Sequence, residues 1–157
     1  MNYVGSYDNQ NNIYIKRVYK DIILLQKKYE ISFHNIFKIN NKFILYFYLN
    51  NRQYIFGINI HYPFKAPTLK INKKLYYFYY FDKYKNIKEK CPIINIKCPC
   101  CENISCNWSP TLRLNDLLYD CIKYEKIYKD LISFYIFYKN NIFDDLVYQY
   151  VSFYLFN

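Results

Sequence analysis

Glycine and long apolar runs are both scarce in this chain. Only 2 of its 157 residues are Gly, which excludes phosphate-binding loops of the G-x-G-x-x-G or Walker type. The longest apolar candidate, Leu131 to Tyr138, is closed by charged residues at both ends and falls short of the roughly 18 residues that a membrane span needs. The start of the sequence lacks a basic region followed by an apolar one, so we expect no secretory signal.

Aromatic residues and lysine are abundant instead. The 22 Tyr and 13 Phe exclude intrinsic disorder, and 157 residues suffice for one domain with a sizeable core. The joint excess of Lys, Asn, Ile, Tyr and Phe is typical of an A/T-rich genome, such as that of a virus or a parasite, and part of the net charge of +10 is ascribed to this bias. We expect a cytoplasmic protein, in a host cytoplasm or nucleus if the source is a virus or parasite. Its 6 cysteines are then expected to be thiols or metal ligands rather than disulfides.

The pattern of apolar residues predicts an α+β fold. Residues 13–30 repeat apolar side chains at the spacing of an amphipathic helix. Runs of β-branched and aromatic residues, separated by Asn-Asn pairs, then predict a four-stranded antiparallel meander over residues 31–39, 43–49, 53–60 and 69–71. A cysteine-bearing segment precedes C-terminal helices, one with Asn115 as its N-cap and a break near Asn140, the next beginning at Asp144.

Four segments of the chain resemble the ubiquitin-conjugating enzyme family, which has the UBC fold. Residues 15–22 look like the family's first helix, and Tyr-Pro-Phe-Lys-Ala-Pro at residues 62–67 is close to its Tyr-Pro-Phe-Lys-Pro-Pro corner. Residues 108–115, Trp-Ser-Pro-Thr-Leu-Arg-Leu-Asn, resemble its Trp-Ser-Pro segment, and residues 116–122 resemble the helix that follows. The resemblance implies a single UBC-like domain over residues 1–157, with its core at about 13–125, an insertion at about 73–97 and a C-terminal helical extension at about 126–157.

The resemblance also implies an enzyme that accepts ubiquitin or a ubiquitin-like modifier as a cysteine thioester and passes it to a lysine, with no cofactor for the transfer step. The family's cysteine lies eight residues before the Trp, a position that Cys100 holds here, with Cys101 and Cys106 as runners-up. The implied partners are the modifier, an activating enzyme and a ligase. The basic face of the first helix is either a plain solvated surface or resembles the family's docking surface for the activating enzyme, through Lys16, Arg17 and Lys20.

The chain departs from the family where the oxyanion should be stabilised. The family's His-Pro-Asn tripeptide is absent before the cysteine, and Asn95 is the residue that could replace its amide. Loss of one oxyanion donor costs roughly two to three powers of ten in rate. The alternative is therefore a catalytically inactive UBC-fold variant that binds ubiquitin or acts as a scaffold.

Four of the cysteines lie within residues 98–106, a density that codon bias does not explain. Cys98-Pro99-Cys100-Cys101 contains one C-x-x-C knuckle, whereas a strong zinc signature has two. A structural zinc held by Cys91, Cys98, Cys101 and Cys106 would leave Cys100 free, so it is compatible with an acyl-carrying Cys100. A set of inert packed thiols is the remaining alternative.

Residues 75–90 interleave Tyr and Phe with Lys and permit a further class of function. Such a composition could stack the bases and neutralise the phosphates of single-stranded nucleic acid. We favour instead an A/T-biased surface insertion whose aromatic side chains fold onto the core. A basic nucleic-acid-binding protein is therefore the least favoured of the functions considered.

Overall fold

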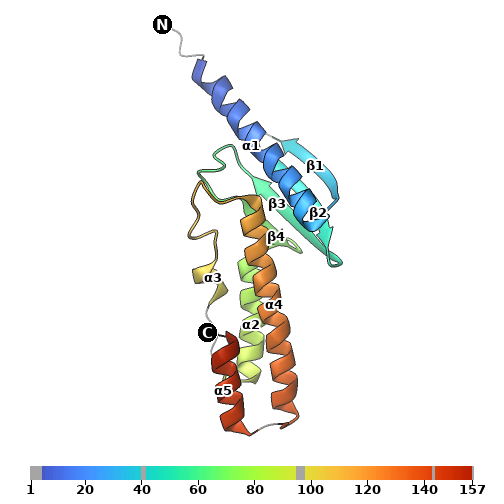
Figure 1. The fold of residues 1–157 in the computed structure, drawn as a ribbon, viewed down its shortest axis with the longest axis vertical. Coiled ribbons are helices and arrows are strands. Elements are labelled where there is room, and N and C mark those ends of the chain that lie inside the picture. The colour runs from blue at the N-terminus through green and yellow to red at the C-terminus, as the bar shows by residue number, and fades with distance from the viewer. Residues whose placement is uncertain (1–4, 40–41, 95–97, 143, 157) are drawn as a thin grey trace.

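Five helices and five strands are present in a computed structural model, which describes residues 5–39, 42–94, 98–142 and 144–156 (Figure 1). The fold is α+β, as predicted, and the helix expected over 13–30 is confirmed, although it begins earlier, at Gly5. The elements in chain order are α1 (Gly5–Tyr29), β1 (Phe33–Ile39), β2 (Lys42–Leu49), β3 (Arg52–Ile58), β4 (Thr68–Ile71), β5 (Lys74–Leu75), α2 (Tyr76–Lys90), α3 (Pro99–Glu102), α4 (Leu114–Lys139) and α5 (Asp145–Phe156).

The strands form one antiparallel sheet in the order β1-β2-β3-β4-β5. The predicted number of four strands is wrong, because the chain turns back after β4 and adds the short strand β5. The turn is made by Asn72-Lys73, whose φ angles are 48° and 70°. Asn50-Asn51 makes the predicted hairpin turn between β2 and β3, with φ of 51° and 60°, because asparagine tolerates left-handed backbone. The other predicted turn, Asn40-Asn41, lies outside the described residues.

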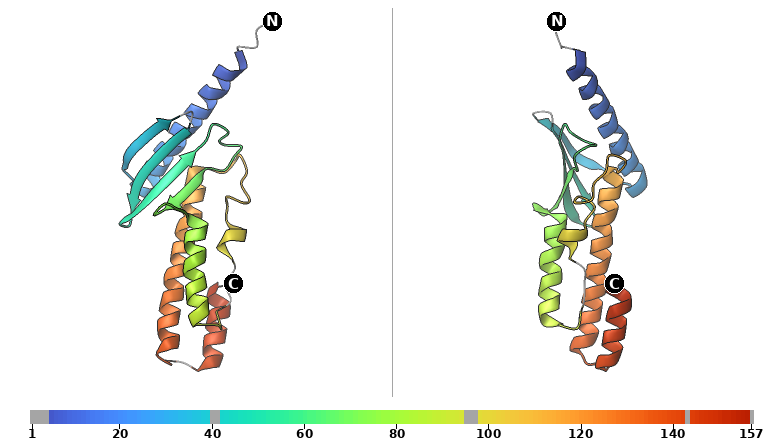
Figure 2. Two further views of the ribbon diagram at one scale, coloured as in Figure 1. Left: turned by 180° about the vertical axis from the view of Figure 1, so that it is seen from behind. Right: turned by 90° about the vertical axis from the view of Figure 1, so that its left-hand side faces the viewer.

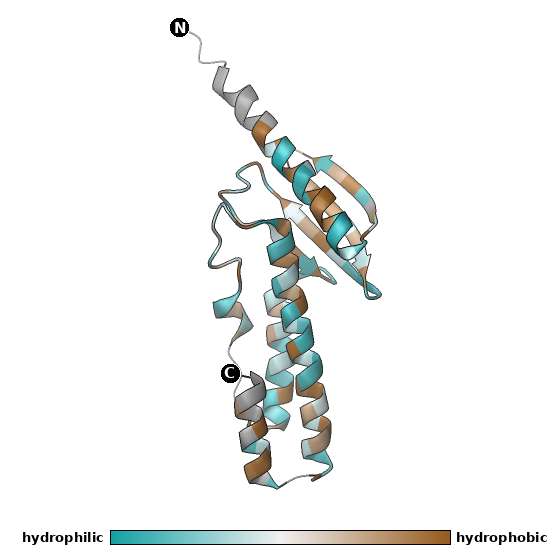
Figure 3. Cartoon of the chain, viewed as in Figure 1, coloured by the Kyte–Doolittle hydropathy of each residue, from teal (hydrophilic) through white to brown (hydrophobic). Residues whose placement is uncertain are grey.

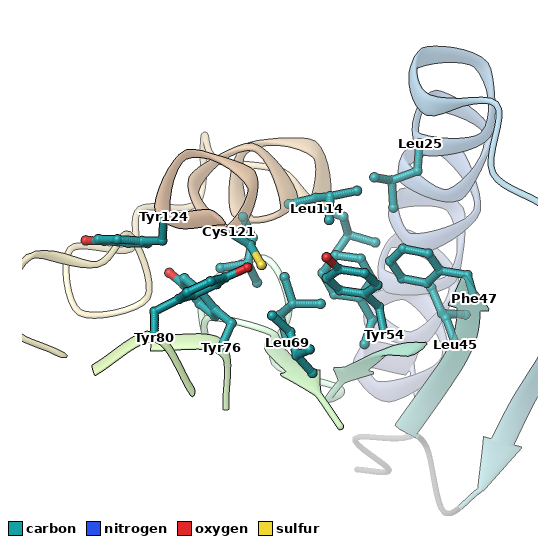
Figure 4. Close-up of a cluster of buried hydrophobic side chains, with 14 of the residues drawn as sticks. Leu25, Leu45, Phe47, Tyr54, Leu69, Tyr76, Tyr80, Leu114, Cys121 and Tyr124 are labelled. Carbon is teal, nitrogen blue, oxygen red and sulfur yellow. The ribbon is translucent and has the colours of Figure 1, made fainter. Parts of the chain in front are cut away.

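α1 lies across one face of the sheet (Figures 1 and 2). Every second residue of β2 and β3 is buried, as period-two alternation requires for a sheet with one covered face. Figure 4 shows Leu25 of α1 beside Phe47 of β2 in this layer. Full burial of each such side chain contributes about 1.5–3 kcal/mol. The buried set is Val18, Ile22 and Leu25 from α1, Phe43, Leu45 and Phe47 from β2, and Tyr54, Phe56 and Ile58 from β3.

α2 and α4 run side by side and extend away from the sheet (Figures 1 and 2). Every fourth residue of α2 is buried, namely Tyr76, Tyr80 and Tyr84, so a stripe of tyrosines faces α4. Tyr124 of α4 stacks on Tyr80 with ring centroids 6.3 Å apart. Tyr76, Tyr80 and Tyr84 therefore pack on the core, as favoured above, whereas Phe78 and Phe81 are exposed. The helix that carries them was not predicted from the sequence.

α4 continues past the core and is followed by α5, which packs back against its end. The predicted break near Asn140 is confirmed, and Asn141 there has a φ of 50°. Tyr148 of α5 contacts the rings of Phe134 and Tyr138 with centroids 5.5 and 5.3 Å away. Hydrophilic residues interrupt α4 along its length (Figure 3). Across the described parts of the chain, none of the helices combines the length and the apolar character that crossing a membrane requires.

Candidate functional site: the cysteine turn

The four clustered cysteines lie on a short connection beside α2 and α4, which we call the cysteine turn (residues 98–106; Figure 1). α3 supplies one helical turn, in which the amides of Cys101 and Glu102 donate to the Cys98 carbonyl at 3.1 and 3.4 Å. A second turn follows, closed by the Cys106 amide on the Asn103 carbonyl at 3.1 Å. Two consecutive tight turns explain how cysteines up to eight residues apart come close in space.

Asn103 and Asp120 anchor the cysteine turn. The Asn103 side chain is fully buried, and its Nδ2 donates to the carbonyls of Pro99 and Cys100 at 3.2 and 3.0 Å. Asp120 of α4 accepts the Ile104 amide at 3.2 Å and the Tyr76 hydroxyl at 2.6 Å. The turn is thus tied to both long helices by hydrogen bonds. The sequence analysis missed both residues, and Asn103 carries no signal that would have identified it.

Three thiols converge at the surface of the turn. The Sγ atoms of Cys98, Cys100 and Cys101 all lie within 4.8 Å of one another, and those of Cys100 and Cys101 are 3.6 Å apart. Cys98 and Cys100 are half-buried and Cys101 is exposed. Cys100, the predicted nucleophile, is therefore reachable from solvent but is not an isolated thiol.

Cys106 lies next to this group without joining it. Its Sγ is 3.7 Å from the Cys100 carbonyl oxygen and accepts a hydrogen bond from Asn103 Nδ2 at 3.3 Å. Its amide donates to Asn103 Oδ1 at 3.1 Å. The Asn103 carboxamide thus holds both the backbone and the sulfur of Cys106 at the edge of the cluster.

The clustered thiols lose their protons in succession rather than independently. Partial burial opposes ionisation of Cys98, but hydrogen bonds from Cys100 and Cys101 outweigh it and lower the pKa of the Cys98 thiol. The hydrogen bond to Cys98, together with burial, raises the pKa of Cys100 to about 12. Of these two thiols, the arrangement therefore favours the thiolate on Cys98 and the neutral form on Cys100.

The remaining predicted site residues lie apart from this cluster. Cys91 is fully buried at the end of α2, and burial raises the pKa of its thiol. Among the cysteines, aspartates, glutamates and histidines of the described ranges, the group that could hold a metal contains Cys98, Cys100 and Cys101 but neither Cys91 nor Cys106. Asn95, the predicted oxyanion donor, lies outside the described residues.

An open cavity of about 440 Å³ adjoins the cysteine turn on the side of α2. Cys98 and Pro99 form one wall, and Phe81, Tyr84, Lys85, Lys88 and Glu89 of α2 form the other. Lys85 and Glu89 lie 3.9 Å apart at its exposed rim. The ammonium groups of Lys85 and Lys88 therefore line the same cavity as the Cys98 thiol, whose pKa is lowered.

Two of the four segments that carry the family resemblance meet near the N-terminal end of α4. The indole Nε1 of Trp108 donates to the Pro63 carbonyl at 2.7 Å, and the ring lies 6.1 Å from that of Tyr62. The corner at residues 62–67 and the Trp-Ser-Pro segment are thus joined directly. Trp108 thus attaches the segment that follows the cysteine turn to the corner beside the sheet.

A buried carboxylate beneath the corner holds this arrangement together. Asp21 of α1 is 1 % exposed and accepts hydrogen bonds from Arg17 Nε at 3.2 Å, Arg113 Nη1 at 3.0 Å and the Tyr62 hydroxyl. Arg17 also donates to the Leu112 carbonyl at 3.2 Å. Of the three basic residues predicted to dock a partner, Arg17 is therefore engaged within the fold, while Lys16 and Lys20 are exposed.

Asp21 could have been identified from the sequence. It stands on the buried side of the α1 pattern, three residues after Val18 and next to Ile22. A carboxylate on an apolar stripe demands a buried partner, and Arg17 four residues earlier is the nearest candidate on the same helix face. The sequence analysis treated Arg17 as a surface residue and left this pair out.

No protein-family model matches the chain, and comparison with curated proteins and with solved structures likewise finds no match.

Proposed function

We propose that the chain is a divergent ubiquitin-conjugating enzyme that holds ubiquitin or a ubiquitin-like modifier as a thioester on Cys100 and passes it to a substrate lysine. The hydrogen bond between Trp108 Nε1 and the Pro63 carbonyl, 2.7 Å long, carries this proposal. It joins the two motifs that most resemble the family, and the thiol eight residues before the Trp lies at the surface of the adjoining turn.

The transfer consists of two acyl exchanges. In the first, the Cys100 thiol loses its proton to water and its sulfur attacks the thioester carbonyl of the charged activating enzyme. The new C–S bond forms as the old one breaks, and the enzyme's thiolate leaves. In the second, a lysine amine attacks the Cys100 thioester, the C–S bond breaks, the amine loses a proton and the Cys100 thiolate is regenerated. The products are an isopeptide and the free thiol, so no cofactor is consumed.

The surroundings of the cysteine turn support the binding part of this role. The exposed Lys16 and Lys20 of α1 remain free of ion pairs in the described part of the molecule and are available to an acidic surface of an activating enzyme. Three of the aromatic side chains in residues 75–90, Tyr76, Tyr80 and Tyr84, are buried against α4, which removes them as stacking platforms for nucleic acid. The role places the chain in the cytoplasm or nucleus, with a ligase as the further partner.

A second candidate is a catalytically silent UBC-type binding module. The observation that favours it is the gathering of Cys98, Cys100 and Cys101 within 4.8 Å. The hydrogen bond to Cys98 raises the pKa of the Cys100 thiol, which disfavours the thiolate that would attack a thioester. Such a module would bind the modifier without forming an adduct.

The two candidates are separated by an adduct assay. Freshly reduced, chelator-treated protein is incubated with activating enzyme, ATP and modifier, and is analysed with and without reductant. We expect a reductant-sensitive adduct that Cys100→Ser abolishes or converts into a reductant-resistant oxyester. Cys91→Ala, which removes a buried thiol outside the turn, is the matched control and should charge normally. Absence of any adduct, or an adduct that survives in Cys100→Ser but disappears in Cys101→Ser or Cys106→Ser, would contradict the proposal for Cys100.

A further inference from the structure

We propose that the cysteine turn is a zinc site, formed by the thiolates of Cys98, Cys100, Cys101 and Cys106, and that zinc and the acyl group compete for Cys100. The metal site stands on the geometry of the turn alone. The competition rests in addition on the proposed function. The site differs from the ligand set predicted from sequence, because Cys100 replaces the distant Cys91.

The spacing of the sulfur atoms fits a tetrahedral thiolate site. Two thiolates that each lie about 2.3 Å from one tetrahedral zinc are about 3.8 Å apart. The Cys100 and Cys101 Sγ atoms are 3.6 Å apart, and Cys98 Sγ lies within 4.8 Å of both. Three ligands are therefore close to their bonding positions, and small side-chain rotations bring them to equal distances.

Cys106 is placed to supply the fourth sulfur. Its Sγ lies 3.7 Å from the carbonyl oxygen of Cys100, so it borders the residue at the centre of the cluster. Its backbone is fixed by the Asn103 carboxamide, whose Oδ1 accepts the Cys106 amide while Nδ2 holds the sulfur. To join the metal, the exposed Cys106 side chain gives up its hydrogen bond from Asn103 Nδ2 and rotates toward the other three thiols. Asn103 is then a positioning residue of the site.

The fold also gives a reason for a metal at this place. The described parts of the connection between α2 and α4, residues 91–94 and 98–113, contain one four-residue helix, and the Ile104 amide ties the turn to Asp120 of α4. A metal that joins four residues of such a segment adds stability to a stretch with little regular secondary structure. When zinc occupies Cys100, its sulfur cannot attack a thioester, so the metal-bound form would be inactive in transfer.

Cobalt binding tests the site independently of any transfer activity. The reduced full-length chain is titrated anaerobically with Co²⁺, and the sulfur-to-cobalt charge-transfer and d–d absorption bands are recorded. We expect one tetrahedral Co²⁺ per chain, displaced by an equimolar amount of Zn²⁺. Loss of an outer-shell partner of a metal ligand costs roughly tenfold to hundredfold in affinity. Loss of a ligand itself should weaken Co²⁺ binding by at least as much in each of four single variants, Cys98→Ser, Cys100→Ser, Cys101→Ser and Cys106→Ser. Cys91→Ala should bind Co²⁺ like the unaltered chain.

Two results would overturn the site. One is the absence of thiolate-to-cobalt bands in the reduced, folded chain, with folding checked by circular dichroism. The other is binding that is unchanged by Cys106→Ser or by Cys100→Ser, because either sulfur would then not be a ligand.

Competition is tested by adding one equivalent of Zn²⁺ to the adduct assay. The adduct should fall at least tenfold, whereas Cys98→Ser/Cys106→Ser, which keeps Cys100 but loses two ligands, should charge equally with and without zinc. The thioester of the activating enzyme itself is measured in the same reaction, so that inhibition of that enzyme is recognised. Bound Co²⁺ with no adduct under any condition would refute the transfer function and leave the metal site standing. An adduct that zinc does not reduce would refute the competition.

Discussion

The sheet with α1 and the region formed by α2, the cysteine turn and α4 bury their polar groups in different ways. Beneath the corner of the sheet region, the carboxylate of Asp21 is met by two guanidinium groups and a phenol hydroxyl. In the helical region, the thiols of Cys98, Cys100 and Cys101 bond mainly to one another. Buried phenol hydroxyls without a hydrogen-bond partner among the described residues occur in both regions, at Tyr29 of α1 and at Tyr80 of α2.

This difference separates the charged groups of the sheet region from the thiols of the candidate site. The carboxylate and guanidinium groups beneath the corner are paired within the fold, whereas Cys98, Cys100 and Cys101 are partly or fully exposed. The two regions are not independent, because Glu125 of α4 is 3.0 Å from Arg52 of β3 and accepts the Tyr54 hydroxyl at 3.4 Å. The sheet and α4 are thus joined by a charged contact.

Alkaline pH should destabilise both regions. Burial is the main cause that raises the pKa of Tyr76, Tyr80, Tyr84 and Tyr124 in the helical region, and of Tyr14, Tyr54 and Tyr62 in the region of the sheet and α1. The folded chain therefore holds these phenol protons more tightly than the unfolded chain does. Their contribution to stability is complete below about pH 10 and is lost as the pH rises toward the folded-state values. The loss is about 1 kcal/mol per tyrosine between pH 10 and 11 and approaches about 1.4 kcal/mol per pH unit above that.

Two signals can follow this loss. Far-ultraviolet circular dichroism reports on the helices of both regions, and the single Trp, Trp108, reports on the corner of the sheet region. We expect both signals to change together above pH 10, with tyrosinate absorbance rising in parallel. Recovery of both signals at pH 8 serves as the control for chemical damage. Loss of the helical signal with unchanged Trp108 fluorescence would show that the two regions unfold separately.

The buried carboxylate provides the next largest effect. Asp21→Asn leaves Arg17 and Arg113 without their anion and should lower the free energy of unfolding by about 3 kcal/mol, the low end for a broken buried pair, because both guanidiniums are partly exposed. Asp82→Asn is the matched control, since the ion pair of Asp82 with Lys74 is exposed. It should change stability by less than about 1 kcal/mol. Urea unfolding at pH 7 measures both, and equal losses would refute the role assigned to Asp21.

The sheet region was largely predictable from the sequence because its apolar residues stand out from their neighbours. They recur at helical spacing in α1 and at every second position in β2 and β3, so the periodicity reveals the buried face. α2 offers no such contrast, because Tyr77, Phe78, Tyr79 and Phe81 flank the buried tyrosines and mask their spacing of four. β5 has two residues and depends on the turn at Asn72-Lys73, too short a segment for any periodic pattern.

The candidate site was predictable in its members but not in its arrangement. The cysteine density of residues 98–106 identified the turn, and the family resemblance selected Cys100. Which cysteines converge depends on two tight turns and on Asn103, whose buried hydrogen bonds leave no trace in spacing or composition. Cys91 was grouped with the cluster because it is near in sequence, whereas the structure buries it at the end of α2.

The smallest predicted effect tests the comparison within the helical region itself. Tyr80 and Tyr84 lie four residues apart on the same buried stripe, but the Tyr84 hydroxyl donates to the Tyr124 carbonyl at 2.8 Å while that of Tyr80 lacks a partner among the described residues. Tyr84→Phe should therefore lower the free energy of unfolding by about 1 kcal/mol, and Tyr80→Phe should raise it by about 1 kcal/mol, since it removes a buried hydroxyl that forms no bond. The two replacements are chemically identical, so helix propensity and ring packing cancel between them, and urea unfolding at pH 7 compares neutral phenols in both. A loss of stability in both variants would mean that the Tyr80 hydroxyl is hydrogen-bonded in solution.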